Sequence, residues 1–118
     1  MALACARAAA ERRGIDPVLL DLRGVSSVAD FFLVVSGRSD TQVRAISEGI
    51  EHDLRAEGHR PLGVEGLRTG QWVLLDYEDV VVHVFYETAR QFYDLERLFS
   101  TAPRLPLPVE APAASDPQ

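Results

Sequence analysis

The feature that most constrains the fold is a pair of apolar runs, WVLLD at 72–76 and VVVHVFY at 80–86. Within each run, successive side chains would point to opposite sides, as they do in a strand. A tight connection at Tyr77–Glu78 separates the two runs, which together predict an antiparallel β-hairpin. We expect this hairpin to form part of a larger sheet.

Three more strands are predicted before the hairpin. Pro17 opens an extended run, VLLDLRG, whose near-continuous apolar character indicates that both of its faces are covered. Phe31–Val35 is the most apolar strand, and its aromatic and β-branched residues predict that it lies at the centre of the sheet. A short third strand starts at Pro61 with the sequence PLGVEG.

Two helices are predicted in the first half of the chain. Residues 2–13 are rich in alanine and predict a helix that stops at Gly14. A second helix starts after Ser39, which forms a capping box with Gln42, and runs to about Glu57. Its inward face is an apolar stripe at spacings of three and four residues, made of Val43, Ile46, Ile50 and Leu54.

A third helix is predicted over residues 88–100. Its large apolar residues recur at spacings of three and four, which predicts that Phe92, Leu95 and Phe99 belong to the core. Leu98 lies on the opposite side of this helix and is a candidate for a second apolar contact with a partner.

The predicted order is α-β-β-α-β-β-β-α, a mixed five-stranded sheet covered by helices in a single α/β domain at 1–102. From Pro103 onwards five prolines accompany alanine and serine, which predicts a disordered Pro/Ala-rich tail at 103–118. No apolar run approaches the twenty residues of a membrane-spanning helix. The single cysteine, Cys5, cannot form an internal disulfide and favours a reducing, cytoplasmic location.

Charge is concentrated around the hairpin. Residues 65–96 carry −5 of the formal net charge of −6, through seven acidic side chains against Arg68 and Arg90. Binding nucleic acid through its phosphates needs a clustered basic face, whereas the arginines here are scattered and lysine is absent. We therefore expect no direct nucleic-acid binding, and an acidic patch that suits a basic protein partner.

Two acidic residues at the hairpin turn, Asp76 and Glu78, resemble the alternating carboxylates that hold Mg²⁺ in nucleotidyltransferases. Glu78 lies in the turn itself, however, where alternation no longer guarantees a common face, and the chain offers no lysine to hold a triphosphate. A solvated turn with an acidic rim is the preferred interpretation, with neither a metal nor a cofactor. A metal-dependent nucleotidyltransferase-like enzyme is the alternative.

Two further residues of the hairpin have competing interpretations. Trp72, the single tryptophan, either caps the core or is an exposed anchor with Tyr77, Tyr93 and Asp94 around it. Both interpretations stay open. His83 lies in the middle of a strand with no partner at metal-ligand spacing. We expect a half-buried histidine that is hydrogen-bonded to a neighbouring strand or helix.

Three segments together resemble one known family, the ribosomal silencing factors (RsfS, also called Iojap-type proteins). They are DLRGVSSVADFFLVVSGRSDTQVRAI, PLGVEG and WVLLDYEDVVVHVFYETARQFYDLERLF, within residues 15–100. The resemblance implies a nucleotidyltransferase-like fold without catalytic equipment, and so not an enzyme. It also implies binding to a large-subunit ribosomal protein of the L14 family, which would block docking of the small subunit. Translation would then be repressed when nutrients or energy run short.

The same resemblance implies which residues contact the partner: Glu65, Trp72, Tyr77, Asp79, Tyr93, Asp94 and Glu96. Two positions depart from the family pattern, because Glu78 replaces the usual turn glycine and Phe99 stands where a tryptophan is common. No transit peptide is visible, so a bacterial cytoplasm is expected. A homodimer off the ribosome is a further expectation, since a second copy could cover an exposed Trp72 patch.

Overall fold

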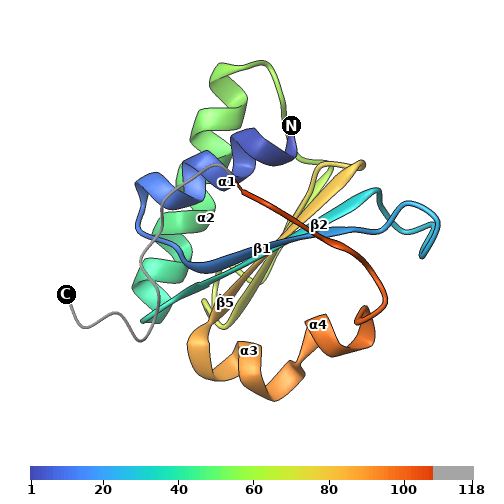
Figure 1. Cartoon of the computed structure of the whole chain (residues 1–118). Helices are drawn as coiled ribbons and strands as arrows, with labels where there is room; N and C mark the ends of the chain where they lie inside the picture. Colours follow the sequence, from blue (N-terminus) through green and yellow to red (C-terminus); the bar gives the residue numbers. More distant parts are fainter. Residues whose placement is uncertain (108–118) are drawn as a thin grey trace.

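The computed structural model describes residues 1–107, in which helices cover both faces of one central sheet (Figure 1). α1 and α2 lie on one face, and α3 and α4 lie on the other. The elements are α1 (Ala2–Glu11), β1 (Ile15–Asp21), β2 (Phe31–Gly37), α2 (Asp40–Ala56), β3 (Gly63–Glu65), β4 (Trp72–Asp76), β5 (Val80–Tyr86), α3 (Glu87–Tyr93), α4 (Leu95–Leu98) and β6 (Arg104–Leu105). The predicted mixed α/β class is confirmed.

Within residues 1–107 the sheet has six strands in the order β3-β4-β5-β2-β1-β6, so the predicted count of five is wrong. The additional strand is β6, in which Leu105 pairs with Leu19 of β1. The Asp21 N–H donates to the Pro103 carbonyl, which can accept although proline has no N–H to donate. A strand of two residues is too short to show an alternating pattern in the sequence. The proline and alanine content around it therefore predicted a disordered tail at 103–118. Residues 108–118 of that tail lie outside the described residues.

The order of strands places the hairpin beside the centre of the sheet. β2 is a central strand, as predicted, and runs parallel to β5, whereas its pairing with β1 is antiparallel. In the β4–β5 hairpin, Trp72 lies opposite Phe85, and Leu74 lies opposite His83. Since directly opposite side chains share a face, these four residues all face α3 and α4.

The other face of the hairpin packs against α1 and α2. Every residue of the predicted α2 stripe is fully buried there, which confirms the periodicity argument. The Ser39 Oγ accepts a hydrogen bond from the Gln42 N–H at 3.0 Å, and the Gln42 Oε1 accepts from the Arg38 N–H at 2.6 Å. The predicted N-terminal cap therefore forms, with the return bond one residue earlier than in the usual capping box.

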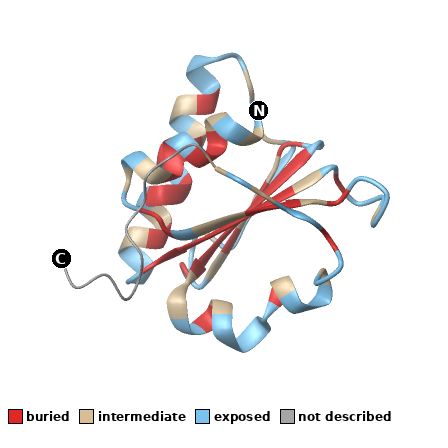
Figure 2. Cartoon of the chain, viewed as in Figure 1, coloured by how far each residue is buried: buried red, intermediate tan, exposed pale blue. Residues whose placement is uncertain are grey.

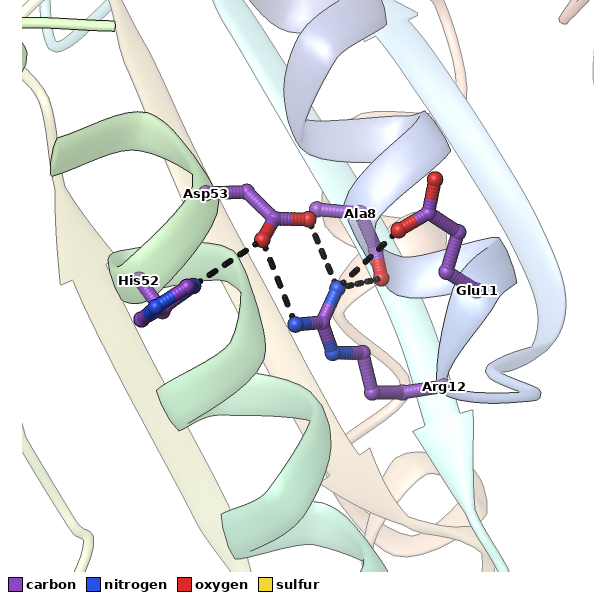
Figure 3. A network of polar contacts seen from close by, with 5 residues as sticks. All are labelled: Ala8, Glu11, Arg12, His52 and Asp53. Atoms are coloured by element: carbon purple, nitrogen blue, oxygen red, sulfur yellow. Dashed lines mark hydrogen bonds and ion pairs between the residues drawn. The ribbon is translucent and has the colours of Figure 1, made fainter. Parts of the chain in front are cut away.

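One ion pair ties α1 to α2 (Figure 3). The Arg12 guanidinium donates to both carboxylate oxygens of Asp53, at 2.6 and 3.2 Å. This hydrogen bonding holds the pKa of the Asp53 carboxyl below its usual value. The guanidinium passes directly over Gly49, where a Cβ would overlap its atoms. A glycine on α2 is therefore what allows the Arg12 side chain to reach Asp53.

The helices on the second face are shorter and more exposed (Figure 2). α3 ends and α4 begins at Asp94, which adopts a left-handed conformation with φ 49°. Leu95 is buried and Phe99 packs at the edge of the core, as predicted. The prediction for Phe92 is wrong, because its side chain is 80% exposed. The single helix expected over residues 88–100 is interrupted at Asp94. The spacing of three and four residues, which predicted that Phe92 faces the core, therefore does not hold across this break.

Candidate functional site

The site begins with the strand pairing that gathers residues around Trp72. β3 pairs with β4 so that Glu65 lies opposite Leu74, which puts Glu65 on the same face as Trp72. A shallow hollow of about 250 Å³ is lined by Glu65, Gly66, Trp72 and Leu74. Gly66 has φ +90°, and a Cβ there would overlap the Trp72 carbonyl oxygen. Only glycine lets the loop after β3 turn this closely over the start of β4.

Trp72 combines the two roles that the sequence left open. One part of the indole packs inward, because its ring stacks on Phe85 with centroids 4.8 Å apart. Its Nε1–H donates to His83 Nδ1 at 3.1 Å. The residue nevertheless stays partly exposed beside Tyr93, whose ring centroid is also 4.8 Å away. The indole is therefore anchored in the sheet and still presents surface.

Large apolar side chains on α3 and α4 extend this surface. Phe92, Tyr93 and Leu98 are 80%, 50% and 76% exposed, and the Phe92 ring meets Tyr93 edge-on at 5.1 Å. A broad hollow of about 760 Å³ runs over Gln91–Asp94, Arg97 and Leu98. Trp72, Tyr93 and Phe92 thus form a continuous row of aromatic rings. The sequence signal missed this, because helical spacing assigned Phe92 to the core.

Two of the predicted acidic residues lie next to this row, and both are exposed. Asp94 directly follows Tyr93 at the break between α3 and α4, and Glu65 lines the hollow beside Trp72. We call the residues Glu65, Trp72, Leu74, Phe92, Tyr93, Asp94 and Leu98 the Trp72 surface. This surface has a hydrophobic centre and acidic groups at its edge.

Glu96 lies nearby, but its carboxylate is bound within the chain. The Arg90 guanidinium donates to both of its oxygens, at 2.9 and 3.2 Å, and Arg104 approaches it at 3.6 Å. Arg90 also donates to the Ser36 Oγ at 2.9 Å, which links α3 to β2. Both members of the Arg90–Glu96 pair are largely buried. In this arrangement Glu96 holds α4 in place and offers little free charge to a partner.

Tyr77 and Asp79 lie away from the Trp72 surface. Tyr77 is 5% exposed and packs in the core between the sheet and α1 and α2. Its hydroxyl is buried without a hydrogen-bond partner among residues 1–107, and burial raises its pKa. Asp79 is exposed at the turn, at the opposite end of the hairpin from Trp72, and its carbonyl accepts from the Asp30 and Phe31 N–H groups. The turn, where strand alternation ends, therefore separates these two residues from the other predicted contacts.

The acidic pair at the turn is arranged as a turn and not as a ligand set. The Asp76 Oδ1 accepts a hydrogen bond from the Glu78 N–H at 2.8 Å. Glu78 has φ 74°, the left-handed conformation that a glycine would adopt without strain. In the described part of the chain, no three histidine, cysteine, aspartate or glutamate side chains lie together so that they could hold a metal ion. Within residues 1–107, no helix has the length and apolar content that crossing a bilayer requires.

Comparisons with known proteins agree on one family. The whole chain, residues 1–118, matches the family described as ribosomal silencing factor during starvation. It is 43% identical over 98 residues to the ribosomal silencing factor RsfS of Bacillus subtilis, covering 83% of each chain. The chain belongs to the RsfS family. Members of this family are named for a regulatory role and not for a catalysed reaction.

Solved structures give the same result for the fold. A crystal structure of a Chromobacterium violaceum protein superimposes with a TM-score of 0.82 at 32% identity, covering 93% of this chain and 91% of that one. A Bacillus halodurans crystal structure gives a TM-score of 0.79 at 35% identity, covering 88% of this chain and 94% of that one. The mixed sheet and its helices in this RsfS-family chain are therefore shared with experimentally solved proteins.

Proposed function

We propose that this RsfS-family protein represses translation by binding an L14-family protein of the large ribosomal subunit and blocking the docking of the small subunit. The observation that carries the proposal is the exposed aromatic row of Trp72, Tyr93 and Phe92 beside acidic residues. Tryptophan and tyrosine are enriched among residues that dominate binding energy, and a hydrophobic centre with a polar rim is the usual anatomy of an interface. Repression would operate in the bacterial cytoplasm under nutrient or energy limitation.

The charge of the site favours a basic protein partner. Residues 65–96 hold −5 of the net charge, and Glu65 and Asp94 place part of it at the rim of the Trp72 surface. An acidic rim repels nucleic-acid phosphates and attracts lysine and arginine side chains. Association should therefore slow as salt is added, because screening weakens the attraction between the two surfaces.

The proposed mechanism is steric and needs no reaction. The alternative, a metal-dependent nucleotidyltransferase-like enzyme, would use Asp76 and Glu78. The Asp76 carboxylate already accepts a backbone hydrogen bond from Glu78, which argues against a role as a metal ligand. We also propose that the fold is nucleotidyltransferase-like in shape but does not catalyse that reaction. Off the ribosome, a second copy of the chain could occupy the Trp72 surface as a homodimer.

The test is sedimentation of the purified protein with isolated large subunits, isolated small subunits and joined ribosomes. The proposal expects co-migration with large subunits alone, and fewer joined ribosomes when small subunits are then added. Failure to co-migrate with large subunits at low salt would refute it. Cross-linking to a ribosomal protein outside the L14 family would refute the partner while leaving the silencing role intact.

Variants of the Trp72 surface locate the contact. Phe92→Ala removes an exposed ring at little cost to the fold, and Asp94→Asn removes a charge while keeping a residue that tolerates the left-handed conformation. Trp72→Ala should weaken binding by roughly 2–4 kcal/mol, or about 30- to 1000-fold. Val28→Ala is the matched control, since Val28 is 69% exposed in the loop between β1 and β2. Equal binding by all four variants would place the interface elsewhere.

A further inference from the structure

His83 is a buried polar side chain directly beneath the Trp72 surface. It is 3% exposed, in the middle of β5, and its ring packs edge-on against Phe32 with centroids 4.5 Å apart. Its Nδ1 lies 3.1 Å from the Trp72 Nε1 on the neighbouring strand. An indole nitrogen can only donate, so Nδ1 must be the acceptor and the histidine proton must lie on Nε2. The contact therefore selects one neutral tautomer.

The rest of the His83 environment gives no other reason for a histidine. The Nε2 is buried and finds no hydrogen-bond partner among the residues that the structure describes. A buried donor without a partner opposes folding, and a phenylalanine would fill the same aromatic neighbourhood without that cost. Burial lowers the His83 pKa to about 4, so the ring is neutral at physiological pH and Nδ1 is free to accept. What histidine provides here and phenylalanine cannot is the acceptor for Trp72.

We infer that His83 is a positioning residue, which holds the Trp72 indole in its partner-binding orientation through the Nε1–H···Nδ1 hydrogen bond. This inference rests on the proposed function, in which Trp72 contacts the partner. Stacking on Phe85 and Tyr93 sets the distance of the indole from the sheet, but stacked rings can slide and rotate. The hydrogen bond to His83 also fixes the direction in which the indole N–H points. An indole that is already oriented loses less conformational freedom when the partner binds.

Two substitutions separate the acceptor from the ring. His83→Phe keeps an aromatic ring of similar size and removes the acceptor. His83→Asn keeps an acceptor, Oδ1, near the position of Nδ1 and removes most of the ring. A structural role predicts that the asparagine variant is the worse one in every assay. A positioning role predicts that it binds better than the phenylalanine variant, although it is less stable.

The direct readout is the Trp72 indole N–H resonance in a ¹H–¹⁵N correlation spectrum, where the single tryptophan gives one indole peak. In His83→Phe we expect this peak to move and its proton to exchange faster with solvent. Binding to large subunits should weaken by roughly three- to tenfold, the range for one side chain that must be ordered on binding. In His83→Asn the peak and the affinity should stay close to those of the unchanged protein.

Circular dichroism first establishes that each variant is folded. Wild-type affinity in folded His83→Phe would overturn the inference, and so would an asparagine variant that loses affinity as the phenylalanine variant does. If the unchanged protein fails to bind large subunits, the proposed function fails. The indole resonance then tests the positioning role without a binding assay. An unmoved peak in His83→Phe would show that His83 does not position the ring.

Discussion

Because His83 is buried, we expect this protein to lose stability on mild acidification, at a higher pH than that at which the Asp53 carboxyl titrates. Burial lowers the His83 pKa to about 4 in the folded chain, whereas an unfolded chain would titrate near the ordinary 6.5. Between about pH 4 and pH 6.5, His83 is protonated in the unfolded state but stays neutral in the folded state. Stability is therefore fully present above pH 6.5 and is lost as the pH falls towards 4.

The magnitude follows from the separation of the two pKa values. One pKa unit corresponds to 1.36 kcal/mol, so a separation of about 2.5 units amounts to about 3 kcal/mol. The slope approaches 1.4 kcal/mol per pH unit inside the window. The Asp53 carboxyl accepts hydrogen bonds from Arg12, which hold its pKa below the ordinary 3.8, so it titrates at lower pH than this window. A loss confined to the window from 6.5 to 4 is therefore specific to a buried histidine.

Urea unfolding followed by far-ultraviolet circular dichroism, at intervals from pH 7.5 to pH 4.5, measures this loss. The urea midpoint should fall by roughly 1–3 M over the range, given typical slopes for domains of this size. His83→Phe is the control, because it removes the titrating ring and keeps the aromatic packing. Parallel pH profiles for the two proteins would refute the reasoning and would mean that water or a polar group reaches the Nε2.

Three further substitutions test other parts of the structure by urea unfolding. Tyr77→Phe removes a hydroxyl that has no partner in the described residues; we expect equal stability or up to about 1 kcal/mol more, and unchanged large-subunit binding. Glu78→Gly relieves a left-handed backbone and should stabilise by roughly 0.5–1 kcal/mol, whereas a loss would mean that the Glu78 side chain has a role. Arg90→Met leaves the Glu96 carboxylate without its main partner and should cost roughly 2–4 kcal/mol; a neutral result would contradict the structural role of the pair.

Elements with a strong local period were the ones that sequence could predict. The α2 stripe and its Ser39 cap are set by neighbours within one helical turn, and both are present as expected. The two apolar runs of the hairpin likewise determine their own pairing. The strand β6 could not be predicted in this way, because two residues are too few to show an alternating pattern. Its pairing depends on β1, more than eighty positions earlier in the chain.

The candidate site was harder to predict because it depends on where regular structure stops. Phe92 has the spacing of a core residue, but the left-handed turn at Asp94 ends its helix and leaves the ring exposed. Tyr77 is a predicted partner contact through the family motif, whereas the hairpin turn places its side chain on the opposite face, in the core. The sequence could offer contact between Trp72 and Tyr93 only as one of two interpretations, since no local pattern connects β4 to α3.

The short strands at both margins of the sheet bear on how the protein avoids aggregation. An unpaired strand edge offers free backbone donors and acceptors to a neighbouring molecule, which can add its own strand there. In the described chain, the outer strands are β3 and β6, of three and two residues, so neither offers a long template. Prolines 103 and 106 flank β6, and Pro17 interrupts the irregular start of β1, so donors are missing where the edge would otherwise be open. A chain that ended at residue 102 would uncover β1, and its first defect would be self-association through that edge, with the proposed silencing activity lost only as a consequence.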